Sequence, residues 1–159
     1  MCPEVFSDLK GISTSGYIEP ETIREACSLL SQYKEKSKVI AGGTKLLALM
    51  KKGKISPEFI INLKSIPELE YINYSDADGL TVGALTSLTH LQNSSTVRDK
   101  FAIVAQATQE MKPKGIPRWA YYMATIGGTL STPVPSADII PALIALGAKA
   151  KTAGPKGWH

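Results

Sequence analysis

Apolar residues in the first part of the chain follow two different spacings. After Thr22 they recur every three or four positions, which places them on one face of a helix. Thr22 and Glu25 fit a capping box, in which each side chain accepts a hydrogen bond from the other residue's free backbone N–H. Apolar runs at residues 39–41 and 59–61 have the length of strands, with a short helix between them that ends at Gly53. This alternation predicts a small parallel α/β unit. The apolar face of the first helix comprises Ile23, Ala26, Cys27, Leu30 and Tyr33.

The spacing changes in the second part of the chain. Residues 71–74 and 80–83 have the composition of strands and flank Asp78-Gly79, a dipeptide typical of hairpin turns, so we expect an antiparallel element there. Residues 101–111 fit a helix. We expect an irregular stretch at Pro113 to Pro117, a short serine-capped helix at Ser136 to Leu146 and a final strand at Ala148 to Thr152.

Composition is typical of a compact soluble protein. The 159 residues, 43% hydrophobic and 20% charged, suffice for one domain or two small subdomains. No apolar run approaches the roughly 20 residues that span a bilayer, and the segment after Met1 lacks the basic and apolar regions of a secretory signal. We therefore expect a cytoplasmic protein that does not enter a membrane.

Charge and cysteine content exclude several function classes. The net charge of +4 is scattered, with no basic run interleaved with aromatic residues, which argues against nucleic-acid binding. Cys2 and Cys27 are too few for a disulfide framework, and we expect Cys27 to be a buried thiol. Cysteine and histidine ligands at metal-binding spacing are absent, so neither an iron–sulfur cluster nor a zinc site is expected in this chain. Neither His90 nor His159 is placed as a catalytic base.

Two short glycine turns carry the candidate chemistry. Residues 41–44 (Ala-Gly-Gly-Thr) and 124–129 (Ala-Thr-Ile-Gly-Gly-Thr) each follow a stretch that can form a strand. Glycine lets backbone N–H groups close on a phosphate, and a following helix start adds partial positive charge, so two such turns can hold a diphosphate. Glycine pairs also occur in ordinary turns, and neither segment matches the dinucleotide fingerprint or the P-loop.

Short motifs along most of the chain occur in a fixed order. They are Val39 to Leu46 with Met50-Lys51, Ile61 to Leu63, Ile66 to Leu69, Gly79 to Thr86, Ala124 to Gly128, and Pro135 to Asp138 with Pro141 to Leu143. In order and spacing they resemble the FAD-binding medium subunits of molybdenum hydroxylases, the group of xanthine dehydrogenase, carbon monoxide dehydrogenase and aldehyde oxidoreductase types. The resemblance covers residues 17–157.

The resemblance implies a set of cofactor-binding residues. In that family the two glycine loops wrap the pyrophosphate and ribityl chain of FAD, and an acidic residue contacts the flavin's sugar-alcohol hydroxyls. Without the family, Asp138 is better explained as an aspartate in the first turn of a helix, where the macrodipole favours it. No catalytic and no metal-binding residue is implied. The matching positions are Ile40, Ala41, Gly42, Gly43, Thr44, Lys45 and Leu46 in the first loop, Thr125, Ile126, Gly127, Gly128 and Thr129 in the second, and Asp138.

The chain departs from the family at three places. Thr129 stands where the family usually has asparagine, which removes the amide's paired donor and acceptor. The segment 117–123 differs from the usual pattern; its aromatic residues can stack on a ring or form a buried cluster. Lys45 occupies an often acidic position, where it can face a phosphate or solvent. The aromatic residues in question are Trp119, Tyr121 and Tyr122.

The implied fold is α+β, the two-subdomain FAD-binding fold of the vanillyl-alcohol oxidase or PCMH type. We expect an α/β subdomain over residues 1–64 and a second α+β subdomain over 65–159, with FAD between them. The implied function is electron transfer: FAD receives electrons from a 2Fe-2S small subunit, which receives them from a large subunit that binds the molybdenum cofactor. The chain would then be an oxidoreductase subunit and not the substrate-hydroxylating site.

Two alternatives and one expectation about size accompany this interpretation. The first alternative is that the chain is an independent flavin oxidoreductase. The second is that it is a non-catalytic remnant that keeps the fold for subunit assembly. The resemblance also implies that the family's C-terminal domain is absent after His159, which would weaken FAD binding and favour a homo-oligomer.

Overall fold

A three-stranded parallel sheet organises the N-terminal part of the protein. The computed structural model describes residues 14–110, 118–132 and 138–159. Its sheet has the strand order β1-β3-β2, and β3 is the central, buried strand, with Ile61 fully buried. The predicted parallel α/β unit is confirmed. The strands are β1 (Gly16–Ile18), β2 (Ser37–Ile40) and β3 (Phe59–Asn62).

The helices of this unit begin and end close to the predicted residues. α2 (Ile23–Tyr33) starts at Thr22, whose hydroxyl accepts a hydrogen bond from the Glu25 N–H at 3.1 Å. The reciprocal bond is shifted by one residue, because the Glu25 carboxylate accepts from the N–H of Glu21 at 2.9 Å and not from that of Thr22. The expected face of α2 packs inward, and Cys27 on it is a free, partly buried thiol; Cys2 lies outside the described residues.

The second helix of the unit, α3 (Thr44–Lys51), follows β2 directly through the first glycine turn. Gly53 lies just past its end with a φ of 64°, the left-handed conformation that commonly closes a helix. Three short 3₁₀ turns connect elements here: η1 (Lys34–Lys36), η2 (Leu63–Ser65) and η3 (Pro67–Leu69).

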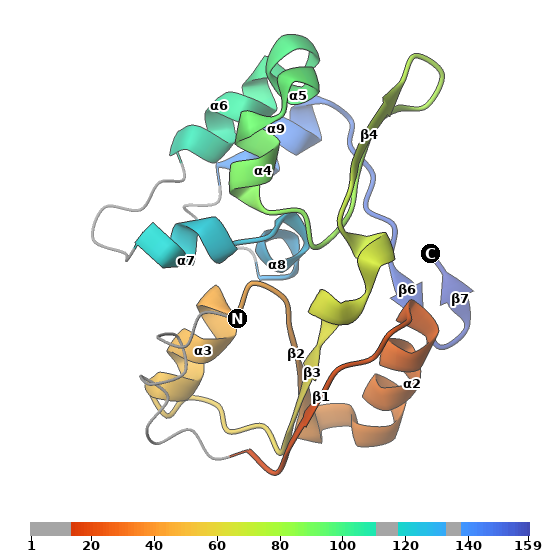
Figure 1. Ribbon diagram of the computed structural model, residues 1–159, viewed down its shortest axis with the longest axis vertical. Helices are drawn as coiled ribbons and strands as arrows, with labels where there is room; N and C mark the ends of the chain where they lie inside the picture. Colours follow the sequence, from red (N-terminus) through yellow and green to blue (C-terminus); the bar gives the residue numbers. More distant parts are fainter. Residues whose placement is uncertain (1–13, 111–117, 133–137) are drawn as a thin grey trace.

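A hairpin and a group of short helices form the rest of the protein (Figure 1). β4 (Ile72–Ser75) and β5 (Gly79–Val82) pair antiparallel across the predicted turn, where Gly79 has a φ of 74°. The predicted helix at 101–111 is confirmed as α6 (Ala102–Glu110). The other helices are α4 (Leu88–Asn93), α5 (Ser95–Lys100), α7 (Arg118–Met123), α8 (Ile126–Ser131) and α9 (Ile139–Ala145). A core shared by α4, α5, α6, α8 and α9 comprises Leu88, Leu91, Val97, Val104, Ala107, Ile126, Ile139 and Ala142.

The C-terminal segment differs from the prediction. Residues 148–152 form no strand; the chain instead forms a small hairpin from β6 (Ala153–Gly154) and β7 (Gly157–Trp158), which lies near α2 (Figure 1). Gly157 adopts a φ of 114° in this hairpin, so a glycine turn and not the preceding lysine-rich stretch determines where pairing occurs. The expected irregular stretch at 113–117 and the expected Ser136 cap lie outside the described residues.

Candidate functional site

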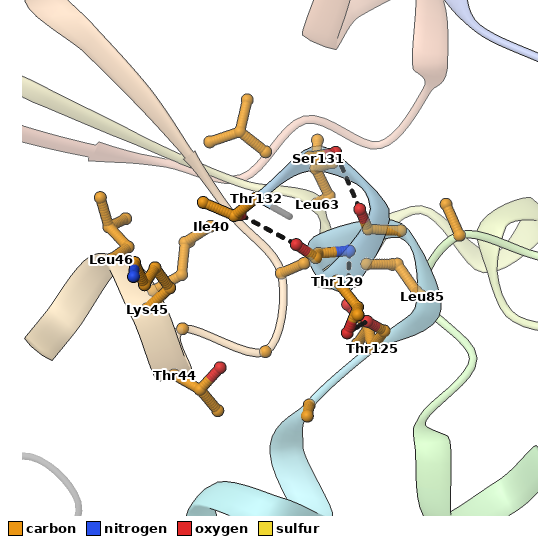
Figure 2. Close-up of a pocket in the computed structure, with 18 of the residues that line it drawn as sticks. Ile40, Thr44, Lys45, Leu46, Leu63, Leu85, Thr125, Thr129, Ser131 and Thr132 are labelled. Atoms are coloured by element: carbon orange, nitrogen blue, oxygen red, sulfur yellow. Dashed lines mark hydrogen bonds between the residues drawn. The ribbon is translucent and has the colours of Figure 1, made fainter. Parts of the chain in front are cut away.

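A cavity of about 510 Å³ lies between the two glycine segments. The end of β2 and the start of α3 form one side, and α7, α8 and the segment after β5 form the other (Figure 2). It is lined by all the predicted cofactor-binding residues except Ile126 and Asp138. Tyr121, which the sequence offered either as a stacking residue or as part of a buried cluster, also lines the cavity. The remaining lining residues were not among the predicted site residues: Val39, Leu63, Ala84, Leu85, Leu88, Ala120, Ser131 and Thr132.

The first glycine turn leaves backbone donors unpaired at the start of α3. Gly43 precedes the helix in the left-handed conformation, with φ 74° and ψ −9°, and no side chain caps the helix. Among the described residues, no hydrogen bond uses the N–H groups of Thr44, Lys45 or Leu46. Unpaired N–H groups at a helix start carry partial positive charge and bind anions. This side of the cavity is therefore suited to a phosphate.

The two glycines of this turn have different roles. Gly43 has a φ of 74°, a conformation that favours glycine, and this is its main role. A Cβ there would also lie 3.2 Å from the side chains of Ile40 and Leu47. A Cβ on Gly42 would lie 1.8 Å from the Met123 carbonyl oxygen, which is far inside contact distance. Gly42 is therefore the point at which the first turn packs against the backbone that leads into α8.

The second glycine segment differs from the prediction in its secondary structure. It follows α7, a helix and not a strand, and Gly127 and Gly128 belong to the first turn of α8. Neither has a positive φ. A Cβ on Gly127 would lie 2.7 Å from the Ala84 carbonyl oxygen, so this glycine allows two parts of the chain to approach each other.

The backbone donors at the start of α8 are already paired within the protein. The Ile126 N–H donates to the Thr86 carbonyl at 3.0 Å and the Gly127 N–H to the Ala84 carbonyl at 2.9 Å. The Gly128 N–H donates to the Thr125 hydroxyl at 3.2 Å, and the Thr129 N–H donates to the Thr125 carbonyl at 3.0 Å. These four N–H groups are therefore used within the protein, and the role of residues 125–129 in holding a diphosphate stays a prediction.

Two predicted residues lie outside the cavity. The Ile126 side chain is buried in the helical core at 6% exposure. Asp138 is exposed at the N-cap of α9, without a side-chain capping bond. The position of Asp138 agrees with the alternative interpretation as an aspartate at a helix start, and the described structure does not bring it to the other site residues.

Tyr121 is the aromatic residue of segment 117–123 that lines the cavity. Its hydroxyl lies 2.6 Å from Gln92 Oε1 and 3.2 Å from the Thr108 carbonyl oxygen, which anchors α7 to α4 and α6. Its ring meets that of the exposed Tyr122 edge-on at 5.8 Å. Burial raises the pKa of Tyr121 above its usual value, with a smaller contribution from Tyr122. The Trp119 side chain lies outside the described part of the structure.

The charge and polarity of the cavity fit a ligand with an anionic part and a flat apolar part. Lys45 is the one charged side chain among the described residues that line it. It stands beside the unpaired N–H groups of α3, while most of the remaining lining is aliphatic or aromatic. Elsewhere in the described residues, no cluster of three or more histidine, cysteine or acidic side chains is positioned to bind a metal ion. The described helices are all too short or too polar to cross a membrane.

Comparison with known proteins identifies the same kind of ligand. Residues 11–159 match the family described as the FAD binding domain in molybdopterin dehydrogenase. The nicotinate dehydrogenase FAD-subunit of Eubacterium barkeri is 32% identical over 83% of this chain and 43% of its own length. The carbon monoxide dehydrogenase medium chain of Afipia carboxidovorans is 30% identical over 89% of this chain and 47% of its own length.

Solved structures give the same fold. In the reconstituted carbon monoxide dehydrogenase from Oligotropha carboxidovorans, one chain superposes with a TM-score of 0.83 at 28% identity, covering 92% of this chain and 49% of that chain. The present chain thus spans about half the length of the relatives it matches. The predicted α+β FAD-binding fold and the predicted cofactor are confirmed, and the chain belongs to the family of FAD-binding domains found in molybdopterin dehydrogenases.

Proposed function

We propose that this chain is the FAD-binding part of the medium subunit of a molybdenum hydroxylase. The observation that carries the proposal is the cavity itself, in which unpaired N–H groups and the exposed Lys45 border an otherwise largely apolar space. The residues present fit FAD, since the start of α3 suits a diphosphate and the aliphatic walls and Tyr121 suit a flat ring.

The proposed roles follow the chemistry of each side of the cavity. Residues 40–46 would hold the diphosphate, and the α8 segment from Thr125 to Thr129 would position the rest of the cofactor. The buried side chain of Ile126 would act through the packing of α8. Asp138 as a ligand of the sugar-alcohol hydroxyls stays a prediction.

When bound, FAD would supply the electron-transfer chemistry, taking up electrons from iron–sulfur clusters and passing them to an acceptor. The chain's own residues would bind and orient the cofactor and keep water from one side of it. Leu85, Leu88 and Ala120 provide the apolar surface for this. We place the cofactor between the two subdomains, residues 1–64 and 65–159, because lining residues come from both.

The proposal includes partners and a compartment. Relatives are medium chains or FAD-subunits of dehydrogenases, so we propose assembly with a large subunit that binds the molybdenum cofactor and a small 2Fe-2S subunit, in the cytoplasm. Substrate oxidation would take place on the large subunit.

The test is flavin reduction with and without partners. FAD-loaded chain, free of metals, is mixed anaerobically with aldehydes and N-heterocycles, and the flavin's visible absorbance band is followed. We expect no bleaching by the chain alone and bleaching once cluster-bearing and molybdenum-bearing subunits are added. Bleaching by the chain alone would establish an independent flavin oxidoreductase, and failure to bind FAD at all would favour a non-catalytic remnant.

A further inference from the structure

Six lysines of the parallel α/β unit gather at the edge of the sheet where its strands begin. α2 and α3 each connect parallel strands, so both helices run back along the sheet and end at this edge, which is lowest in Figure 1. The segments that follow the two helices meet there, since the Glu58 N–H donates to the Lys36 carbonyl oxygen at 2.9 Å. We call this surface the lysine edge; it comprises Lys34, Lys36, Lys38, Lys51, Lys52 and Lys54.

The lysine edge holds the excess positive charge of the chain. Residues 34–38 and 51–58 contain six lysines and two glutamates, a net charge of +4, which is also the net charge of all 159 residues. The other residues carry twelve basic and twelve acidic side chains and are neutral together. The ends of the two helices, at about half a negative charge each, offset about one of these positive charges. The fold therefore concentrates charge that is scattered in the sequence, beyond what capping of the helix ends requires.

Half of the lysine edge has no acidic partner. Lys36 Nζ lies 3.2 Å from Glu58 Oε1, and Lys38 Nζ lies 3.8 Å from Glu35 Oε2. Within the described part of the chain, no carboxylate lies within ion-pair distance of the remaining three exposed lysines outside α3, which are Lys34, Lys52 and Lys54. These three ammonium groups are available to a partner.

The backbone at Lys34 argues that this side chain has a role of its own. Lys34 has a φ of 46° and a ψ of −128°, a conformation that favours glycine. Among the described residues it is the one non-glycine residue with a positive φ. The turn after α2 would therefore be less strained with glycine, so the local backbone does not explain a lysine at this position.

The side chains around these lysines favour a folded acidic protein over a phosphate-rich partner. The Tyr33 ring stacks on Phe59 at 4.1 Å, and the large exposed apolar side chains of the described residues lie outside residues 34–38 and 51–58. This surface thus lacks the free aromatic rings that bind single-stranded nucleic acid and the apolar side chains that enter a membrane interface. Glu35 and Glu58 would repel a uniformly negative phosphate surface, whereas a protein can offer both signs of charge.

Resting on the proposed function for the existence of partner subunits, we propose that the lysine edge docks an acidic face of one of them. The cavity lies at the opposite ends of the strands, and the eight residues of α3, at about 1.5 Å each, put about 12 Å between its start and the lysine edge. A subunit bound here leaves the cavity uncovered. The contact therefore serves assembly, by steering the subunits together.

Association rates at several salt concentrations test this proposal. The FAD-loaded chain is immobilised, and its binding to the cluster-bearing and molybdenum-bearing subunits is followed by biolayer interferometry. We expect the combination of Lys34→Gly, Lys52→Gln and Lys54→Gln to slow association about tenfold at low salt and to reduce its salt dependence. FAD affinity should be unchanged, because none of these residues lines the cavity.

A matched control separates position from total charge. Arg98→Gln combined with Lys149→Gln and Lys156→Gln also removes three exposed basic side chains, all outside the lysine edge and the cavity. We expect this control to associate within about twofold of the wild type. Lys34→Gly alone separates docking from folding: it should slow association without lowering the urea midpoint, since glycine suits the backbone there.

The proposal is overturned if the lysine-edge variant associates as fast as the wild type at low salt, or if the control is slowed equally. Binding of the wild type to a DNA duplex or to anionic lipid vesicles in preference to the subunits, through these same lysines, would also overturn it. A wild type that binds neither subunit contradicts the proposed function, and this inference falls with it. Subunit binding that is unaffected in the lysine-edge variant leaves the proposed function standing and removes only this surface.

Discussion

The glycines at this site act mainly by allowing two backbone segments to approach closely or by adopting a positive φ. Gly42 is the clearest case, because its α-carbon packs against the Met123 carbonyl oxygen and joins the first turn to the approach of α8. Gly43 has a separate role, the positive φ that starts α3. The aliphatic and glycine lining indicates that the proposed cofactor site depends as much on close backbone packing as on side-chain chemistry.

Gly42→Ala should separate the two sides of the cavity. The added Cβ would overlap the Met123 carbonyl oxygen at 1.8 Å, and overpacking against backbone typically costs about 1–3 kcal/mol or more. We expect the free energy of unfolding, measured in urea, to fall by at least about 2 kcal/mol and FAD affinity to fall with it. Gly154→Ala, whose nearest non-neighbouring atom would be 3.8 Å away, is the control and should stay within about 0.5 kcal/mol. Equal stabilities for the two variants would refute this role of Gly42.

Tyr121 should ionise at a higher pH than an exposed tyrosine. Burial disfavours the phenolate and raises the pKa of Tyr121 above 10.0. Its contribution to stability is therefore fully present below pH 10.0 and is lost as the pH rises through the raised pKa of the folded state. The difference in tyrosinate ultraviolet absorbance between the wild type and Tyr121→Phe gives the titration of this group. A midpoint at or below pH 10.0 would contradict the assignment.

At the scale of elements, local sequence signals determined some helices and strands and tertiary contacts determined others. α2, β2, α3, β3 and the β4–β5 hairpin were predictable because each has a cap, a glycine stop, an apolar run or a turn dipeptide of its own. β1 was not, since three residues beginning with Gly16 carry no pattern and become a strand only by pairing with β3.

α8 shows the same limit within the candidate site. The glycine pair was identified from the sequence, but adjacent glycines disfavour a helix, so its helical first turn was not predicted. That turn exists because the carbonyl oxygens of Ala84 and Thr86 accept its N–H groups.

The start of α2 gives a prediction at this scale. Thr22→Ala removes the hydroxyl that accepts from the Glu25 N–H, and loss of such a cap costs about 1 kcal/mol. Urea denaturation should show a lower midpoint with an unchanged slope. Ser31→Ala, an exposed serine within the same helix, is the control and should have little effect. If both variants unfold at the same urea concentration as the wild type, the cap does not contribute to stability.

At the scale of the whole molecule, the cavity lies where the parallel α/β unit meets the helical part. α7 contacts α3 on one side and α4 on the other, and α4, α5, α6, α8 and α9 share one core (Figure 1). The start of α3 supplies unpaired backbone N–H groups, and α8 supplies glycine and hydroxyl residues to the lining. Cofactor binding should consequently stabilise both parts together, because the ligand contacts both.

The most direct test of FAD binding in this cavity is a titration with Gly128→Leu. Gly128 lines the cavity, and outside the backbone of α8 the described residues place one atom within 4 Å of a Cβ there, Thr125 Oγ1 at 3.0 Å, so a leucine side chain would extend into the space assigned to the cofactor. Leucine also favours a helix more than glycine does, which supports α8. Ala102→Leu, at an exposed position of α6 outside the cavity, is the control. We predict that wild type and Ala102→Leu bind FAD and quench its fluorescence, whereas Gly128→Leu keeps its circular dichroism spectrum and loses binding. A folded Gly128→Leu variant that binds FAD as tightly as the wild type would show that the cofactor does not occupy this cavity.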